Sequence, residues 1–252
     1  MFFGFEIDYL MLLFVIGTFS AFINVVSGGG SALVLPILIM MGMDSVAANG
    51  TNRLAILALT ISAVVSLRRN EISDFRFSLK MSLFTLPGVI LGAIYAQYIS
   101  TEAFKEILAW IIFIIIILMI LPNSFRKSIT RQLSQYPKFV YVSMIFIGFY
   151  GGFIQTGVGF VLMLLLQSFL DLDLLKVNMH KVFIVLIYTI PAFIIFAWND
   201  KIEWVPGIIL AIGNTLGAYW SVKLSIKKGD KVVKIFLIIS LIILSLKMLN
   251  IF

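Results

Sequence analysis

The sequence predicts an all-α polytopic membrane protein made of two inverted repeats, each containing a helix broken by glycines. Three observations lead to this prediction. Of the 252 residues, 61% are hydrophobic and only 12% are charged, and the mean hydropathy is +1.10, which lies outside the range of soluble domains. Apolar segments long enough to cross a membrane recur along the whole chain. Glycine-rich breaks interrupt this pattern at related positions in the two halves.

Long apolar segments each approach the roughly 20 residues that a membrane-spanning helix needs. They cover residues 7–27, 45–67, 77–99, 103–121, 139–156, 174–197, 204–222 and 231–250. The first has no basic n-region and no small-residue cleavage site, so we interpret it as a retained span. Two shorter apolar pieces, 31–42 and 158–170, follow the glycine breaks and would reach only about 20 Å as helices. We predict that they are half-helices or the return arms of re-entrant hairpins, giving about eight long helices and two short membrane-inserted pieces.

The first break, Gly28 to Gly30, lies in the middle of apolar sequence. Each glycine costs about 1 kcal/mol relative to alanine in a helix interior, so three in a row end a helix. A broken backbone at membrane depth must be buried in protein or line a water-filled cavity. The break is therefore a candidate substrate site.

Spaced identities relate the two halves of the chain. Gly28 and Gly30 recur 129 residues later as Gly157 and Gly159. The same offset relates Asp44 to Asp173, Asn49 to Asn178, Asn70 to Asn199, and Asp74-Phe75 to Glu203-Trp204; with a gap of four residues, Gly88, Leu91, Gly92 and Ala93 match Gly213, Leu216, Gly217 and Ala218. A duplicated unit explains these matches. It predicts an N-terminal transmembrane repeat (1–121), a cytoplasmic linker (122–138) and a C-terminal transmembrane repeat (139–252). In this scheme the glycines spaced by four permit close helix packing.

Charge placement predicts the topology. If each glycine break begins a second membrane-inserted piece, the basic loops 68–80, 126–138 and 223–234 fall on one side, as the positive-inside rule requires. If the breaks were aqueous loops, the rule would be violated. Lys176 and Lys181 join them there, and the Lys and Arg residues left elsewhere are Arg53, Lys105, Lys201 and Lys247. We therefore predict ten membrane-inserted segments with both termini outside the cytoplasm.

Two basic residues approach the middle of the membrane. Arg53 is about 13 Å along its helix from Asp44, and Lys181 is about 12 Å from Asp173. No Asp or Glu lies deep in any segment. A charge at the membrane centre costs at least ~2.5 kcal/mol, and a bound anion would compensate it, helped by backbone N–H groups at the glycine breaks and by helix N-termini. Snorkelling of either side chain to an interface is the alternative.

Amides share the helix face of each deep cation. Asn49 and Asn52 precede Arg53 by four and one residues, and Asn178 precedes Lys181 by three. The predicted substrate-binding set is Asn24, Ser27, Gly28, Gly29, Gly30, Asn49, Thr51, Asn52, Arg53, Gln155, Thr156, Gly157, Gly159, Asn178 and Lys181. His180, the one histidine, either handles protons or has a structural role.

Two motifs follow one another in the first half: Ser27-Gly28-Gly29-Gly30 with Pro36, and then Ala48-Asn49-Gly50-Thr51-Asn52-Arg53. With these motifs the sequence resembles the sulfite exporter TauE/SafE family of membrane transporters, and the resemblance covers nearly the whole chain. It implies transport of small sulfur-containing or organic anions, such as sulfite, sulfoacetate or related sulfonates, across the bacterial cytoplasmic membrane. The second half departs from the pattern, because Asn178-Met179-His180-Lys181 stands where a second Gly/Ala-Thr-Ser-like motif is expected. We therefore expect the halves to contribute unequally to the site.

The resulting prediction is a secondary transporter that exports a small anion by alternating access. An anion channel and an uptake permease remain alternatives. An intramembrane enzyme is disfavoured, because the chain has one His, no Cys, and neither a GxSxG nor an HExxH motif. We predict no cofactor and no metal. The predicted partners are the anion, membrane lipids and possible further copies of the chain, with no nucleic acid.

Overall fold

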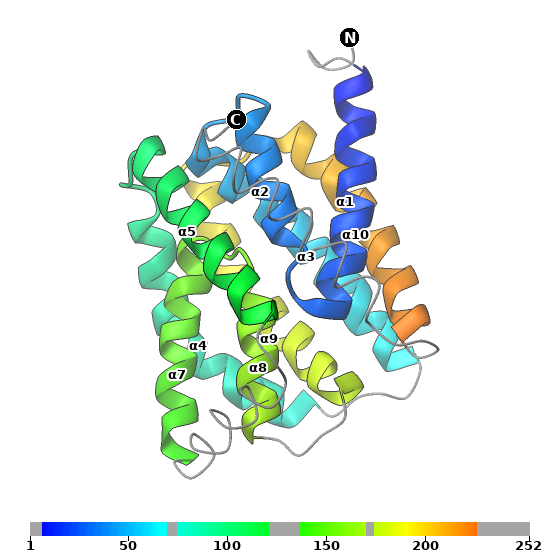
Figure 1. The fold of residues 1–252 in the computed structure, drawn as a ribbon, viewed down its shortest axis with the longest axis vertical. Helices are drawn as coiled ribbons and strands as arrows, with labels where there is room; N and C mark the ends of the chain where they lie inside the picture. The colour runs from blue at the N-terminus through cyan, green and yellow to red at the C-terminus, as the bar shows by residue number, and fades with distance from the viewer. Residues whose placement is uncertain (1–6, 70–74, 121–136, 170–173, 226–252) are drawn as a thin grey trace.

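The computed structural model describes residues 7–69, 75–120, 137–169 and 174–225, most of which are helical (Figure 1). The helices are α1 (Ile7–Ser27), α2 (Ser31–Met40), α3 (Ser45–Arg69), α4 (Phe75–Tyr95), α5 (Thr101–Ile120), α7 (Pro137–Phe153), α8 (Val158–Phe169), α9 (Leu174–Trp198) and α10 (Trp204–Ser225). No strand occurs in these ranges. The all-α class is thereby confirmed; the predicted span 231–250 and most of the predicted linker lie outside the described residues.

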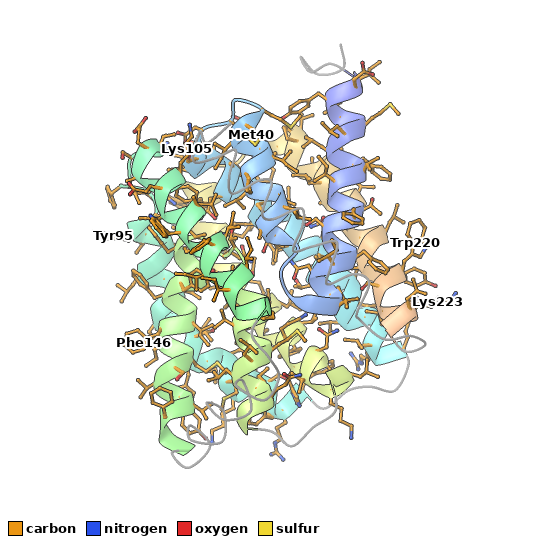
Figure 2. All side chains as sticks on the ribbon, in the orientation of Figure 1. Met40, Tyr95, Lys105, Phe146, Trp220 and Lys223 are labelled. Atoms are coloured by element: carbon orange, nitrogen blue, oxygen red, sulfur yellow. The ribbon has the colours of Figure 1, made fainter. Side chains whose placement is uncertain are left out.

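By length and composition, five of these helices could cross a membrane, namely α1, α3, α4, α9 and α10. Their outer surface is apolar: Tyr95, Phe146 and Trp220 are 63%, 70% and 52% exposed and project from the outer helices (Figure 2). Polar side chains such as Asn49 and Arg53 are instead fully buried. Apolar groups outside and polar groups inside are the arrangement that a lipid environment favours, so the chain is a multi-pass membrane protein.

The first glycine break forms the tip of a re-entrant hairpin. Gly28 has φ +78°, which glycine adopts without steric cost, and α2 then runs back beside α1. The Ser20 hydroxyl donates to the Gly30 carbonyl at 2.7 Å, so α2 begins beside the middle of α1. With only 10 residues, α2 returns to the end of the molecule at which α1 began (Figure 1). This outcome decides between the two alternatives left open by the sequence, since the short piece is a return arm.

The second break, at residues 154–157, forms an equivalent hairpin from α7 and α8, pointing in the opposite direction (Figure 1). Gly157, with φ +71°, marks its turn. Helix α8 has 12 residues and is again too short to cross a membrane by itself. The two hairpin tips therefore approach each other from opposite ends of the molecule.

Glycines permit close, parallel crossings of α1 with α10 and of α4 with α7. A Cβ on Gly213 would lie 2.4 Å from the Phe14 carbonyl oxygen, and one on Gly88 would lie 2.0 Å from that of Ile145. Such contacts exclude any larger side chain. The matched contacts fit the alignment of Gly88 with Gly213, and they confirm close packing as the role of these glycines.

Charged residues separate to the two ends of the bundle. Asp44 accepts a hydrogen bond from Thr101, and the Glu203 N–H donates to Thr51, so the helix ends that carry these residues share one end. We call this the acidic end, and all described carboxylates lie there: Asp8, Asp44, Glu102, Glu106, Asp200 and Glu203. The opposite, basic end carries Arg68, Arg69, Arg76, Lys80, Lys176 and Lys223.

Candidate functional site

The two hairpin tips touch at the centre of the molecule. A Cβ on Gly28 would lie 2.3 Å from the Gly159 carbonyl carbon, so only glycine allows the two backbones to come this close. Ser31, just after the first tip, accepts a hydrogen bond from the Gly157 N–H at 3.3 Å and donates to the Gln155 carbonyl at 3.4 Å. The two breaks predicted from the sequence therefore form one structure shared by both repeats.

Arg53 on α3 caps the end of α7 in the other repeat. Its Nη1 and Nη2 atoms donate to the carbonyls of Gly151 and Gly152, each at 2.6 Å, and its side chain is 0% exposed. Nη2 also lies 3.4 Å from Asn49 Oδ1, and Asn49 donates to the Phe153 carbonyl at 2.6 Å. The last carbonyls of a helix have no partner within the helix and carry the negative end of its dipole, so both side chains stabilise the α7 C-terminus.

Lys181 on α9 makes the corresponding contact with α1. Its Nζ donates to the carbonyls of Asn24 and Val25, both at 2.9 Å, and lies 3.7 Å from Met163 Sδ on α8. The side chain is 1% exposed, which excludes snorkelling in this state. Each deep cation thus contacts the last turn of the first helix of the other repeat. The glycine breaks also leave carbonyls at the ends of α1 and α7 that need donors, and the two cations supply these donors.

A second polar group adjoins Arg53. A Cβ on Gly151 would lie 3.3 Å from the Tyr188 hydroxyl, and Arg53 interacts electrostatically with Tyr188. Gln155, with φ +63°, donates from Nε2 to Thr189 Oγ1 at 3.1 Å. The site therefore combines a guanidinium on α3, a phenol on α9 and a carboxamide in the second hairpin turn.

Several buried polar atoms in this region have no hydrogen-bond partner among the described residues. They are Asn52 Nδ2 and Oδ1, Arg53 Nε, Thr156 Oγ1 and Asn178 Oδ1. The Tyr188 hydroxyl and the Gln155 side chain interact with one another. An unsatisfied buried polar group costs about 1–3 kcal/mol. Buried polar atoms without a protein partner are typical of a site that a ligand or water completes.

Other predicted residues occupy different places. Thr51 Oγ1 accepts a hydrogen bond from the Glu203 N–H at 2.9 Å, so it joins α3 to the α9–α10 loop rather than to the central site. Asn24 contributes its carbonyl to Lys181, and the Thr156 carbonyl accepts a hydrogen bond from the Tyr150 hydroxyl. Gly29 and Gly30 are buried within the first tip. The side chain of Ser27 lies outside the described part.

His180 lies between α4 and α9. Its Nδ1 is 2.7 Å from Ser78 Oγ, and Phe77 packs edge-on against the imidazole ring. The imidazole is 4% exposed. It thus joins the two repeats at a position apart from Arg53 and closer to the basic end.

Tyr188, Thr189 and the carbonyls of Gly151 and Gly152 belong to the site but were not predicted from the sequence. A signal for Tyr188 was present, because it follows Lys181 by seven residues and so shares its helix face. The two carbonyls had none, because a backbone acceptor leaves no mark in the residue type.

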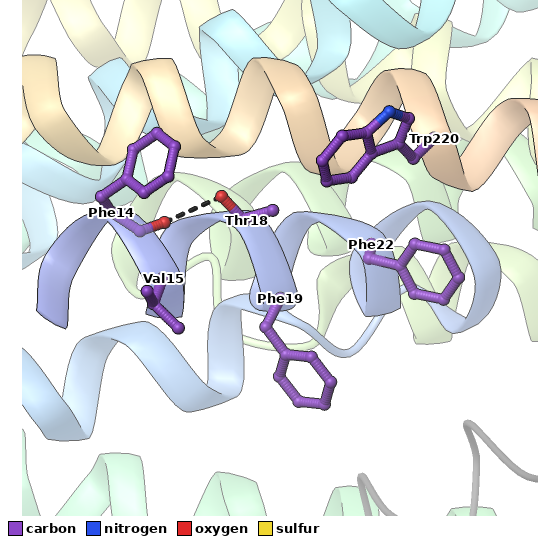
Figure 3. A pocket seen from close by; sticks show the side chains of 6 residues that line it. All are labelled: Phe14, Val15, Thr18, Phe19, Phe22 and Trp220. Carbon is purple, nitrogen blue, oxygen red and sulfur yellow. Dashed lines mark hydrogen bonds between the residues drawn. The ribbon is translucent and has the colours of Figure 1, made fainter. Parts of the chain in front are cut away.

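A groove of about 320 Å³ lies elsewhere, between α1 and α10 on the outer surface (Figure 3). Its lining is Phe14, Val15, Thr18, Phe19, Phe22 and Trp220. The Thr18 hydroxyl donates to the carbonyl of Phe14 at 2.9 Å. An apolar, lipid-facing groove without a charged side chain is not suited to binding an anion. Among the described residues, no group of three or more His, Cys, Asp and Glu side chains could hold a metal ion.

Comparison with known proteins identifies the family. The model of the sulfite exporter TauE/SafE family matches residues 13–248 and so covers both hairpins and both deep cations. The chain belongs to the TauE/SafE family. No solved structure matches this TauE/SafE protein.

Relatives of this TauE/SafE protein occur in several bacteria. A probable membrane transporter protein of Haemophilus influenzae is 27% identical over 242 residues, covering 96% of this chain and 95% of that protein. A probable membrane transporter protein of a Sinorhizobium species is 29% identical, covering 95% and 92%. The probable membrane transporter protein YfcA of Escherichia coli is 26% identical, covering 95% and 89%. Family and relatives together identify this TauE/SafE protein as a membrane transporter.

Proposed function

We propose that this transporter moves a small anion, of the sulfite or organosulfonate type, through the site at which the two hairpin tips meet. The observation that carries the proposal is the pair of buried cations, Arg53 and Lys181, each on the carbonyls of the opposite repeat. The described carboxylates lie at the acidic end, and none forms an ion pair with Arg53 within the described ranges.

Electrostatics support an anionic substrate. The end of a helix carries only about half of a negative elementary charge, whereas Arg53 carries a full positive charge. A residual positive potential therefore remains at the interface. Because the site is buried, this potential is screened less than a surface charge would be, and a monovalent anion would neutralise it.

The contact between the tips favours a mechanism of alternating access rather than an open channel. The Gly28 and Gly159 backbones touch, and Ser31 is hydrogen-bonded across the two repeats, so the centre is closed in this state. Relative movement of the inverted repeats would expose the cations first to one side and then to the other. In such a cycle the anion would replace the helix carbonyls as partner of Arg53 when the tips separate.

The charge distribution supports an orientation in which the basic end faces the cytoplasm and the protein lies in a bacterial inner membrane. Helix α1 would then begin on the outside. An inside-negative potential drives an anion outward with about 2.3 kcal/mol per charge per 100 mV, so export requires no coupling ion. Lys and Arg side chains at the basic end would contact anionic lipid headgroups.

Flux of radiolabelled sulfite in liposomes tests the proposal. Preloaded vesicles with reconstituted protein should release sulfite faster when a potassium diffusion potential makes the interior negative. Arg53→Gln should lower this flux by about tenfold or more, since a hydrogen bond to a charged group is worth about 1.5–3 kcal/mol.

The matched control is Lys105→Gln, because Lys105 is an exposed cation at the acidic end (Figure 2). It removes the same charge and should leave the flux within about twofold, since exposed charges contribute little. Equal flux in Arg53→Gln vesicles, with the variant correctly folded, would refute the assignment of the central site.

A further inference from the structure

Asn52 on α3 is a buried amide whose side chain makes no hydrogen bond. It is 0% exposed, and within the described ranges neither its Nδ2 nor its Oδ1 has a partner. The next residue, Arg53, has an unbonded Nε, although its Nη atoms are engaged. Thr156 in the second hairpin turn is also 0% exposed and has an unbonded Oγ1. Buried polar groups are nearly always satisfied in native proteins, so these side chains require a partner that is not a described residue.

The fold places Asn52 against the second hairpin. On the same face of α3, Asn49 donates to the Phe153 carbonyl at 2.6 Å. One turn after Asn52 on that face, Ile56 belongs to the same buried apolar cluster as the first residue of α8. Thr156 lies between these two parts of the hairpin, in the turn that joins α7 to α8. The Asn52 amide from one repeat and the Thr156 hydroxyl from the other therefore meet on one side of α3.

Asn52 aligns with a cation of the other repeat. The offset of 129 residues relates it to Lys181, whose ammonium group binds carbonyls at the end of α1. In the first repeat the neighbouring Arg53 binds the carbonyls at the end of α7 instead. Asn52 thus has none of the structural contacts that its position has in the second repeat.

The two deep cations differ in the donors that they leave for a ligand. An ammonium group has three N–H groups, and that of Lys181 meets as many acceptors, namely the carbonyls of Asn24 and Val25 and the sulfur of Met163. The guanidinium of Arg53 has a further N–H group on Nε, which is unbonded. A ligand therefore finds an available charged donor at the second hairpin and none on the Lys181 ammonium.

The unbonded donors suit an oxyanion. Asn52 Nδ2, Arg53 Nε and Thr156 Oγ1 each carry a hydrogen, and Arg53 adds a positive charge. A sulfite or sulfonate group accepts hydrogen bonds at several oxygens at once, so one such group could serve all of these donors. A metal cation would use only the oxygens of Asn52 and Thr156 and would be repelled by Arg53.

We propose that Asn52 and Thr156 bind the oxygen atoms of the transported anion together with Arg53 Nε, so that the substrate contacts lie at the second hairpin. Lys181 then holds the first hairpin and does not contact the anion. This inference rests on the proposed anion transport. It adds two neutral donors to the groups that decide which anion binds. A water molecule that enters with the anion donates to Asn52 Oδ1.

Replacement of the two neutral donors tests the inference. Asn52→Leu removes both unbonded atoms at about the same side-chain volume, and Thr156→Val removes only the hydroxyl. Apparent dissociation constants for sulfite and methanesulfonate are measured by titration of the purified full-length protein at constant pH. We expect each variant to bind both anions about tenfold or more weakly than the wild type, because hydrogen bonds to a charged group are the strong ones.

The melting temperature without ligand distinguishes a binding role from a structural one. Asn52→Leu should not lower it, because apolar atoms in place of unbonded polar atoms remove no contact. Asn214→Leu is the matched control, since Asn214 is 1% exposed and donates to the Ala55 carbonyl at 2.9 Å. It should lower the melting temperature and leave both affinities within about twofold. Thr60→Val serves as the control for the threonine, because the Thr60 hydroxyl donates to the Ile56 carbonyl at 2.8 Å, and it should leave both affinities unchanged.

The outcomes separate this inference from the proposed function. If Arg53→Gln abolishes binding while Asn52→Leu and Thr156→Val bind both anions as the wild type does, the inference is overturned and anion transport stands. A melting temperature that Asn52→Leu lowers as much as Asn214→Leu does would also overturn it, because Asn52 would then have a structural partner. Binding of neither anion to the wild type at millimolar concentration would overturn the proposed function and the inference together.

Discussion

Arg53 joins the two repeats through its side chain. Its guanidinium holds two carbonyls of α7 at 2.6 Å and packs 5.0 Å from the centre of the Phe196 ring. The planar fork of arginine suits two adjacent acceptors in a way that the single ammonium of lysine does not. The second repeat carries a lysine at the corresponding place, so the two cations contact the opposite repeat with different geometry.

Sequence reasoning at this scale identified the cations but not their partners. The depth of Arg53 and Lys181, and the spacing of Asn49 before Arg53, could be read from helical periodicity alone. Their partners are backbone carbonyls, which every residue possesses, so no pattern marks them. Tyr188 was missed for a different reason, because a single tyrosine on an apolar helix face resembles a packing residue.

Asp44, outside the membrane-spanning helices, gives a prediction of pH dependence. Partial burial alone would raise the pKa of its carboxyl group, but hydrogen bonds from the Thr101 hydroxyl and from the N–H groups of Ala47 and Val46 lower it below 3.8 overall. A carboxylate whose pKa is lowered by folding stabilises the fold above its ordinary pKa, and this contribution disappears as the pH falls through the lowered value. The melting temperature of the wild type should therefore fall between about pH 5 and pH 3.

The comparison with Asp44→Asn isolates this effect. Asparagine still caps α3 but does not titrate, so the melting temperature of the variant should depend less on pH in this range. Identical melting curves for the two proteins at every pH would show that Asp44 contributes nothing to the acid sensitivity.

The hairpins are the elements that bring the functional groups together. The sequence predicted the two breaks and the two short pieces, because apolar length and runs of glycine are local properties. It did not decide between a short span and a return arm, since that choice depends on contacts between residues distant in sequence, such as Ser31 with Gly157. The predicted end of α7 was also three residues too late, because the turn begins before Gln155.

Gly28→Ala tests the contact between the tips. A Cβ at this position would add a clash at 2.3 Å to the strain of φ +78°, so we expect little folded protein, or a melting temperature lowered by more than about 5 °C. Gly42→Ala is the control, because Gly42 has φ +94° but no atom within 4 Å of a Cβ. This substitution should lower the free energy of unfolding only by the backbone strain, about 1–2 kcal/mol.

Equal melting temperatures for the two variants would contradict the close contact between the hairpins. A large loss for Gly28→Ala alone would show that the contact, and not the backbone conformation, requires glycine. Fluorescence-detected gel filtration and thermal unfolding of the purified variants measure both quantities.

At the scale of the whole molecule, the return arms α2 and α8 each reverse the chain once, so the basic residues at the ends of α3 and α10 and at the starts of α4 and α9 share one end. The matched crossings of α1 with α10 and of α4 with α7 run in opposite directions, so each repeat places the same elements at opposite ends. This arrangement could be predicted from the sequence, because the offset of 129 residues indicated two repeats and the positive-inside rule indicated that they are inverted. The packing of the helices in three dimensions required the structure, since sequence identity between the halves is sparse.

Cysteine labelling tests the orientation of the molecule. The chain has no Cys, so single-Cys variants carry one reactive site each. Tyr98→Cys, at the acidic end and 83% exposed, should react with a membrane-impermeant maleimide in intact cells. Lys223→Cys, at the basic end (Figure 2), should react only after the cells are opened. The reverse pattern would place the basic end outside and contradict the proposed direction of export.

The central claim is that the interface between the repeats binds a small anion through Arg53. Thermal unfolding of the purified protein with sulfite, thiosulfate, sulfate, sulfoacetate, taurine and simple carboxylates tests it most directly, because a ligand that binds only the native state raises the melting temperature. We expect at least one of these anions to stabilise the wild type, and we expect Arg53→Gln to remain folded and to abolish the shift. An equal shift in both proteins would contradict it, because the anion would then bind elsewhere.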